Sequence, residues 1–196
     1  MTPATAADLA ADLRRLGLLP DATPLPGPGP AEAFARHLAA TGVFTPFQLA
    51  AVLRGKAARL RVGPYHLLDR LGEGGMGQVF RARHGWLGNI VALKLIRRDL
   101  VGSAVAGRRF LREIRQAGRL VHPNVVRALD ANEADGNLYL VTELVEGHTL
   151  ADLVKRDGPL AEADACRAAA DAARGDRKST RLNSSHSTLS RMPSSA

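Results

Sequence analysis

Apolar residues recur at helical spacing in three short segments near the N-terminus. These segments are residues 5–16, residues 31–40 and a third that begins after Thr45, and each presents one apolar face. Residues 20–30, between the first two segments, contain five prolines and two glycines, a composition that interrupts helices. The pattern predicts a small helical region over residues 1–62 that includes this Pro/Gly linker.

The third helix carries the clearest start and stop signals. Thr45 is placed as the N-cap and Pro46 as the first helical residue, Gln48 completes a capping box, and Gly55 ends the segment. Three short helices rarely bury enough surface to be stable alone. The region is therefore either a docking unit with its own partner or a helical lead-in to the next domain, and both interpretations stay open.

After Tyr65 the apolar period changes from helix-like to strand-like. Strands are predicted over residues 65–71, 78–83 and 90–96, and the first two are joined through a run of glycines. A helix is predicted to follow them, from Ser103 to about Leu120.

A second hairpin is predicted further along the chain. Residues 125–131 and 138–144 are strand-like and flank Asp135-Gly136, a strong signal for a tight hairpin turn. Two helical segments then follow, over residues 150–155 and from Leu160 to Arg174.

Residues 175–196 depart from the rest of the chain. They are rich in serine and have no apolar period, which is typical of a disordered tail. The string also resembles a translated sequencing adaptor joined to a truncated reading frame, with the seam between Gly175 and Ser179. We expect a non-native or disordered tail over residues 175–196 and leave it out of the functional argument.

Composition excludes several classes of protein. The chain has 196 residues, of which 45% are hydrophobic and 23% charged, as in ordinary soluble globular domains. Cys166 is the single cysteine, so a disulfide framework is excluded and a reducing compartment is favoured. No apolar run reaches membrane-spanning length, and the N-terminus lacks the pattern of a signal peptide. We expect a cytoplasmic location for these residues, and a membrane anchor of the full-length protein would lie outside them.

The net charge of +8 does not indicate a nucleic-acid partner. The basic residues are spread along the chain, apart from a group between Arg54 and Arg61, and no aromatic residues alternate with them. A base-stacking platform needs such aromatics. We therefore expect no nucleic-acid binding.

The glycines between the first two strands carry the first chemical signal. Gly72, Gly74 and Gly77 form a Gly-x-Gly-x-x-Gly pattern, which alone could mark a dinucleotide fold, a kinase loop or a tight turn. A dinucleotide loop opens a helix, whereas a strand-like segment follows Gly77 here, and a Walker A loop requires Gly-Lys-Ser/Thr where Gln78 stands. A glycine hairpin that presents backbone N–H groups to phosphate is the remaining interpretation.

Lys94 is the second signal. Ala92, Lys94 and Ile96 share one face of the third strand, so that Ala92 leaves room for a planar base and Lys94 reaches toward phosphate. The plainer alternative for Lys94 is an exposed lysine on an edge strand. Glu113, on the face of the predicted helix that also carries Ile114, is the expected counter-charge for a buried ammonium. Its plainer alternative is a surface glutamate paired with a neighbouring arginine.

Together these motifs resemble the N-terminal lobe of a bacterial, eukaryotic-like (Hanks-type) serine/threonine protein kinase. The similarity runs from Gly63 to about Arg174. The motifs occur in family order: Leu71 to Phe80, Val91 to Lys94, Arg109 to Glu113, His122-Pro123-Asn124-Val125-Val126, and Leu140 to Gly147. The resemblance implies an α+β fold with a five-stranded antiparallel sheet and a C-helix over residues 63–147. It also implies the start of a truncated C-lobe over residues 148–174, with the small helical region preceding the lobe.

The resemblance also implies an ATP site. Lys94 would hold the α- and β-phosphates with Glu113 as its partner. Thr142 would be the gatekeeper behind the adenine, while Glu143 and Val145 would bind the base through backbone groups. The full set of implied ATP-binding residues is Leu71, Gly72, Glu73, Gly74, Gly75, Met76, Gly77, Gln78, Val79, Ala92, Lys94, Glu113, Thr142, Glu143 and Val145. His122-Pro123-Asn124 would have a structural role only.

The chain also departs from the family. Phosphotransfer needs a catalytic aspartate, and an asparagine and a second aspartate for Mg²⁺, and none has a match here. Arg98-Asp99-Leu100 and Asp157-Gly158 imitate parts of these motifs in the wrong context and are interpreted as turn residues. Mg²⁺ is thus expected only for the complete protein, acting on protein substrates with Ser/Thr hydroxyls. The 196-residue chain is predicted to bind ATP weakly or not at all and to transfer no phosphate.

Two other functions stay open from the sequence. The gene could encode a nucleotide-binding pseudokinase that works as a scaffold. Alternatively, residues 1–55 could be an interaction module whose partner defines the biology.

Overall fold

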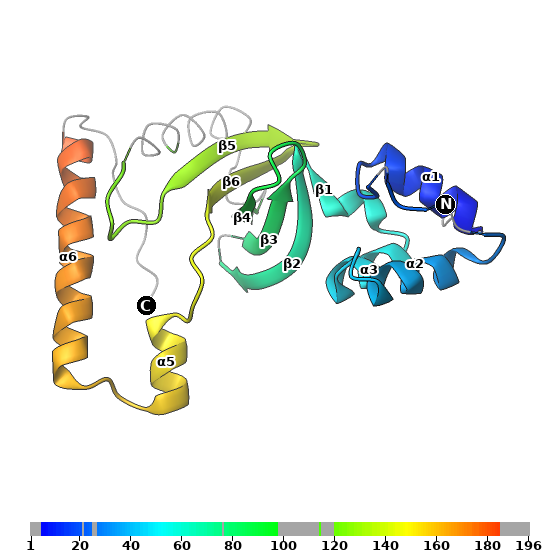
Figure 1. Cartoon of the computed structure of the whole chain (residues 1–196). Helices are drawn as coiled ribbons and strands as arrows, with labels where there is room; N and C mark the ends of the chain where they lie inside the picture. The colour runs from blue at the N-terminus through cyan, green and yellow to red at the C-terminus, as the bar shows by residue number, and fades with distance from the viewer. Residues whose placement is uncertain are drawn as a thin grey trace.

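The computed structural model describes residues 5–20, 22–24, 27–75, 77–97, 114 and 120–184. A helical module, a twisted sheet and two further helices follow one another along the chain (Figure 1). The module contains α1 (Ala6–Arg15), α2 (Ala31–Ala40), α3 (Pro46–Leu53) and the 3₁₀ helix η1 (Ala57–Leu60). The sheet contains β1 (Arg61–Val62), β2 (Tyr65–Gly74), β3 (Gly77–His84), β4 (Ile90–Ile96), β5 (Ala128–Ala134) and β6 (Asn137–Glu143). The last helices are α5 (Leu150–Asp157) and α6 (Glu162–Ser184).

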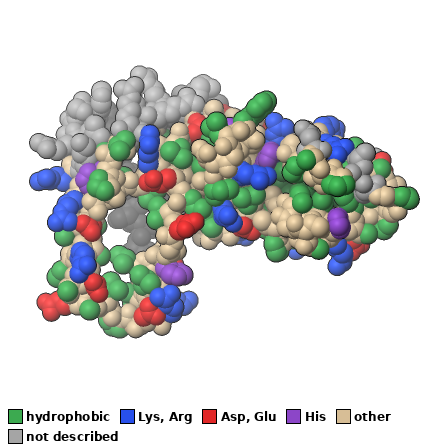
Figure 2. Space-filling model, viewed as in Figure 1, with side chains coloured by type: hydrophobic (Ala, Val, Ile, Leu, Met, Phe, Trp, Pro, Cys, Tyr) green, Lys and Arg blue, Asp and Glu red, His purple; other side chains and the backbone are tan. Residues whose placement is uncertain are grey.

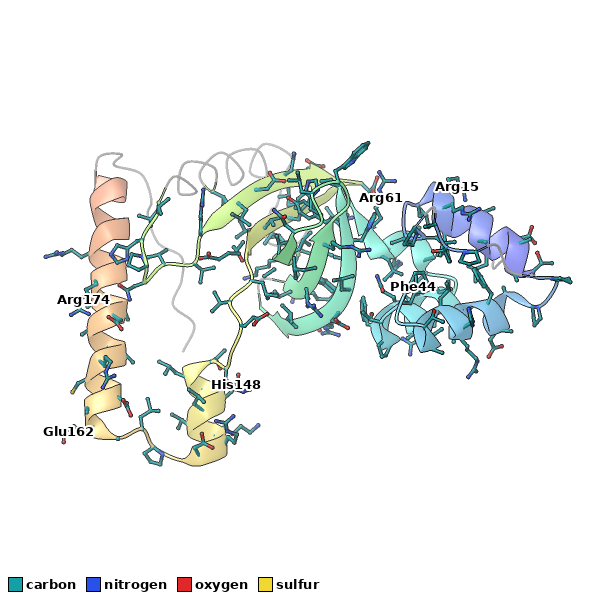
Figure 3. The ribbon with its side chains drawn as sticks, viewed as in Figure 1. Arg15, Phe44, Arg61, His148, Glu162 and Arg174 are labelled. Atoms are coloured by element: carbon teal, nitrogen blue, oxygen red, sulfur yellow. The ribbon has the colours of Figure 1, made fainter. Side chains whose placement is uncertain are left out.

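The helical module has a hydrophobic core of its own. Leu9 and Leu13 of α1, Phe34 and Leu38 of α2 and Leu60 of η1 are all buried in it. Phe44, labelled in Figure 3, belongs to the same cluster. Burial of each large apolar side chain stabilises the module by about 1.5–3 kcal/mol before the cost of ordering the chain. The module is thus packed more completely than its three short helices suggested.

Helix α3 begins as its sequence predicts. Thr45 is the N-cap, its hydroxyl accepts from the Gln48 amide at 3.2 Å, and its own N–H donates to Gln48 Oε1 at 3.0 Å. These bonds satisfy two of the amides that a helix N-terminus leaves unpaired. The predicted capping box is confirmed, with Pro46 at the first helical position.

The sheet is antiparallel, with strand order β1-β2-β3-β4-β6-β5. The five predicted strands are present, and β1 is an additional short strand beside the start of β2. Asp135 and Gly136 both have positive φ, 51° and 69°, as a two-residue hairpin turn requires. The predicted hairpin is confirmed.

The bounds of β5 were predicted wrongly. β5 begins at Ala128 rather than at Val125, and it continues to Ala134. Val125 instead closes a turn, in which its backbone amide donates to the carbonyl oxygen of His122 at 3.1 Å. Before β5 begins, the amide of Arg127 donates to the side-chain carboxylate of Glu143 at 2.8 Å. A side chain thus accepts this bond in place of a backbone carbonyl of the neighbouring strand.

The end of α6 also differs from the expectation. The helix continues past Arg174 to Ser184, so residues 175–184 are helical rather than disordered. Gly175 is buried where the helix passes the backbone of Asn124, and a Cβ atom at this glycine would lie 2.8 Å from the Asn124 carbonyl oxygen. The missing side chain at Gly175 therefore lets the helix pass this turn without a break.

The helix expected from Ser103 to Leu120 lies outside the described residues, apart from Ile114, which is helical, and Leu120. Within the described ranges, no helix has both the length and the apolar character needed to span a membrane.

Candidate functional site

The glycine hairpin closes between β2 and β3, where Gly74 pairs with Gly77. Gly77 has φ of 144°, and a Cβ atom on it would lie 1.8 Å from the carbonyl oxygen of Leu95 in β4. Such an approach is impossible for any side chain, so the fold itself requires glycine here. Gly77 thus brings the hairpin directly against the strand that carries Lys94.

The other three glycines are different. Cβ atoms at Gly72, Gly74 and Gly75 would meet nothing within 4 Å, and none of the three has a positive φ. Nothing in the described part of the chain requires glycine at these positions. Their backbone is free of side-chain cover, which is the property needed for phosphate oxygens to approach main-chain N–H groups.

Lys94 lies on a central strand, because β4 is flanked by β3 and β6. The alternative of an edge-strand lysine is therefore wrong. The strand register places Lys94 opposite Val79 of β3 and opposite Leu140 of β6, and Val79 in turn lies opposite Gly72. Residues directly opposite one another in antiparallel strands share a face. Gly72, Val79 and Lys94, all in the predicted ATP-binding set, thus form one row across the sheet.

The neighbouring row carries the residues expected around the base. Ala92 lies opposite Thr142 of β6 and opposite Arg81 of β3. Because Ala92 and Lys94 alternate with inward-facing residues along one strand, both rows belong to the same face of the sheet. The register therefore assembles four predicted site residues, Val79, Ala92, Lys94 and Thr142, on one surface.

The two faces of β4 differ in burial. Val91 and Leu93 are 3% and 0% exposed, whereas Ala92 and Lys94 are half-buried. Among the described residues, no hydrogen bond or ion pair involves the Lys94 ammonium. The face with Lys94 therefore carries a half-buried ammonium that has no partner among the described residues.

Glu113 and Met76 lie outside the described residues, so their predicted roles stay predictions. The residue that follows Glu113 in sequence is described. Ile114 packs against the small cluster of Ile96, Ala131 and Leu138, together with Leu140. Ile96 shares its side of β4 with Lys94.

The segment after β6 holds the other predicted base contacts. The Thr142 hydroxyl donates to the carbonyl oxygen of Glu143 at 3.1 Å. The Glu143 amide donates to the carbonyl oxygen of Arg127 at 3.0 Å, while its carboxylate accepts from the Arg127 amide. Val145 is 64% exposed. The Glu143 carbonyl keeps a second lone pair that could accept from a base.

Charged groups near the hairpin pair with one another. Arg70 and Glu73 form an ion pair beside the exposed Leu71, and Arg81 lies 3.4 Å from Asp69 across β2 and β3. These pairs are partly exposed and add little stability. Gln78, which is also in the predicted ATP-binding set, is half-buried opposite Leu95.

The remaining motifs have local roles where the structure describes them. His122 Nδ1 accepts from the Asn124 amide at 3.1 Å, as expected of a turn with a structural role. Asp157 is exposed and pairs with Arg156 at 2.7 Å, which holds the pKa of Asp157 below its usual range. Arg98-Asp99-Leu100 lies outside the described residues. The described parts contain no group of three or more acidic, His or Cys side chains suited to a metal ion.

Two residues on this face were not singled out from the sequence. Leu140 stands opposite Lys94, and Arg81 stands opposite Ala92. Their places depend on which strands pair and in what register, and a single sequence does not contain that information for strands that are distant along the chain.

Comparison with known proteins accounts for this arrangement. The family described as "Protein kinase domain" matches residues 65–175, more than half of the chain. The chain belongs to the protein kinase domain family. The match is partial, and the sequence resemblance to bacterial Hanks-type Ser/Thr kinases is confirmed.

The similar proteins are long compared with this chain. Serine/threonine-protein kinases PknH and PknE of Mycobacterium tuberculosis are each 46% identical, over 98 and 99 residues respectively. Each match covers 50% of this chain but only 16% of PknH and 18% of PknE. The chain therefore spans less than a fifth of these relatives.

A solved structure confirms the fold. The crystal structure of the Mycobacterium tuberculosis PknI kinase domain superposes with a TM-score of 0.54 at 24% identity. The match covers 62% of this chain and 50% of that structure. The predicted kinase-like N-lobe, a curled antiparallel sheet with helices, is thus confirmed.

Proposed function

We propose that residues 63–147 form the ATP-binding lobe of a protein kinase that phosphorylates serine or threonine hydroxyls. The row that joins Gly72, Val79 and Lys94 across three strands is the observation that carries this proposal. The row sets a backbone without side-chain cover, an apolar side chain and an ammonium next to one another on one face of the sheet. A nucleotide needs these three features for its phosphates and base.

Each residue has a role in this proposal. Lys94 binds the α- and β-phosphates, and Glu113 orients the ammonium. The backbone from Leu71 to Gln78 covers the phosphates, while Val79 and Ala92 enclose the base. Thr142 limits the depth of the base pocket, and backbone groups of Glu143 and Val145 bind the edge of the base. The position of Ile114 on the side of the sheet that carries Lys94 supports the role of Glu113.

Mg²⁺ would accompany ATP in the complete protein and neutralise the phosphates. The candidate residues named above include no set of ligands for it. We therefore propose that the 196-residue chain binds ATP weakly and transfers no phosphate by itself. Autophosphorylation by the purified chain, measured with radiolabelled ATP, would contradict this.

Substitution of Lys94 tests the nucleotide site. Lys94→Met keeps the length of the side chain and removes its charge, and we expect roughly 10- to 100-fold weaker binding of a fluorescent ATP analogue, as for loss of a charge-assisted bond. Lys155→Met, on the exposed helix α5, removes the same charge away from the site and should leave binding unchanged. Equal affinity of both variants would refute the role of Lys94.

A pseudokinase scaffold is the second candidate. It would share the nucleotide site but not phosphotransfer. An intact gene product that binds ATP and phosphorylates a generic protein substrate supports the kinase, and binding without transfer supports the scaffold.

A further inference from the structure

Helix α3 joins the helical module to the strand that leads into the glycine hairpin. Gln48 is the only buried polar residue found among the described residues, with 4% of its surface exposed. Its Oε1 accepts from the Thr45 amide, and its Nε2 donates to the carbonyl oxygen of Leu67 in β2 at 2.9 Å. The Thr45 hydroxyl donates to the next carbonyl, that of Leu68, at 2.5 Å. Both members of the capping box thus have a second partner on β2.

The backbone of β2 is shaped to accept these bonds. In a regular strand successive carbonyls point to opposite edges, so one edge offers only alternate carbonyls. The pairing of β2 with β3 shifts between Leu67 and Asp69, which marks a bulge at Leu68. A bulge leaves one residue unpaired and redirects its backbone groups. Leu67 and Leu68 can therefore both present a carbonyl to α3.

The hydrophobic contacts are continuous across the same joint. Phe47 packs against the core of the helical module and also against the core of the sheet. Its ring lies 5.8 Å from the ring of Phe80 in β3. The covalent connection between the two cores is also short. Leu60 belongs to the core of the module and Val62 to the core of the sheet, with a single residue between them. Arg61, between them, marks the junction in Figure 3.

We propose that Thr45, Phe47 and Gln48 are positioning residues that brace β2 and thereby hold the glycine hairpin over Lys94. β1 pairs only with Tyr65 and His66, and α3 takes the next two carbonyls on the way to Gly72. Without the brace, the outer strand of the hairpin would be held only by β3, with a second register shift between Arg70 and Gly72. The helical module then acts on the nucleotide site without touching the nucleotide. This inference rests on the proposed ATP-binding function.

Two variants of Gln48 separate the brace from the helix cap. Gln48→Glu keeps an acceptor for the Thr45 amide, and glutamate is a common residue at this capping position, but it no longer donates to Leu67. Gln48→Met removes both bonds at similar volume. Thr45→Ser keeps the hydroxyl and serves as the conservative variant, and Arg36→Ala, which removes an exposed pair with Glu32 in α2, is the matched control.

Amide hydrogen exchange at pH 8 in the nucleotide-free chain is the direct readout. Both Gln48 variants should exchange at least roughly 3- to 10-fold faster over residues 67–74, because both lose the hydrogen bond that Gln48 donates to Leu67, with β6 unchanged. Thr45→Ser and Arg36→Ala should match the unmodified chain. Unchanged exchange over residues 67–74 in both Gln48 variants would overturn the brace.

A second measurement on the unmodified chain covers the case in which the variants do not fold. Exchange in graded denaturant should show α3 and β2 opening as one cooperative unit. If α3 opens at clearly lower denaturant than β2, the brace is wrong. Failure of the ATP proposal would give a different result. Millimolar MgATP would then leave the exchange rate over residues 72–77 of the unmodified chain unchanged, and this result does not depend on the Gln48 variants.

Discussion

The two faces of the sheet are built from alternate residues of the same strands, yet the side chains on them differ in how far they are buried. On one face Leu93 and Val141 are fully buried, in a cluster with Phe80 and Tyr139 that the chain closes with its own side chains. On the other face Ala92, Lys94 and Thr142 are only partly covered. The closed face holds the fold together, and the half-open face carries the chemistry that the fold positions.

The helices at the two ends of the chain show a similar contrast. The helical module buries its apolar residues, whereas α5 has no buried residue, with Leu150 53% and Val154 42% exposed. Hydrophobic side chains are visible on the surface of α5 and α6 in Figure 2.

Truncation of Leu93 should have the largest effect on stability. Leu93→Ala leaves a cavity in the closed face and should lower the free energy of unfolding by about 2–5 kcal/mol. Leu140→Ala, on the half-open face, removes the same atoms from a partly exposed position and should cost less. Urea unfolding followed by circular dichroism measures both. Equal losses would mean that the two faces do not differ.

The glycine hairpin offers a sharper version of the comparison. Gly77→Ala forces a methyl group onto the backbone of β4 and should lower the free energy of unfolding by about 1–3 kcal/mol. Gly74→Ala meets open space and should leave stability unchanged or raise it by up to about 1 kcal/mol, while it weakens ATP binding. Thermal melts and ATP titrations of the two variants separate the effects. Destabilisation by Gly74→Ala would show that this glycine also serves the fold.

The smallest expected effect is a pH dependence at the junction of module and sheet. Burial lowers the pKa of His66 below its ordinary value of 6.5, and Arg83, Arg61 and His84 lower it further. The folded state therefore binds a proton at His66 less tightly than the unfolded state does. This contribution to stability is complete above pH 6.5 and is lost as the pH falls through the lowered pKa.

Replacement of His66 tests this contribution to the free energy of unfolding. The unmodified chain should lose more stability between pH 7.5 and pH 5 than His66→Gln does, in urea unfolding at matched ionic strength. Parallel losses in the two proteins would exclude His66 as the cause.

Local signals in the sequence predicted local structure well. The Thr45 capping box and the Asp135-Gly136 turn each depend on residues within a few positions of one another, so a short window contains the whole interaction. The strand faces around Lys94 were also predictable, because alternation along a strand is a local property.

Interactions between distant segments were not predictable in this way. The second hydrogen bond of Gln48 needs the bulge at Leu68, and the position of Leu140 opposite Lys94 needs the pairing of β4 with β6. The close approach of Gly175 in α6 to the turn at Asn124 likewise joins segments that are distant along the chain. Each depends on tertiary structure, which overrides local composition.

Covalent labelling tests the role of Lys94 most directly. An ATP derivative with an acyl group on its terminal phosphate transfers that group to a lysine amine beside the phosphates, with loss of the nucleotide. Mass spectrometry of the labelled chain compares Lys94 with Lys56 and Lys155. We predict preferential acylation of Lys94, suppressed by excess ATP. Equal labelling of the three lysines, or labelling of Lys94 that ATP does not suppress, would contradict the nucleotide site.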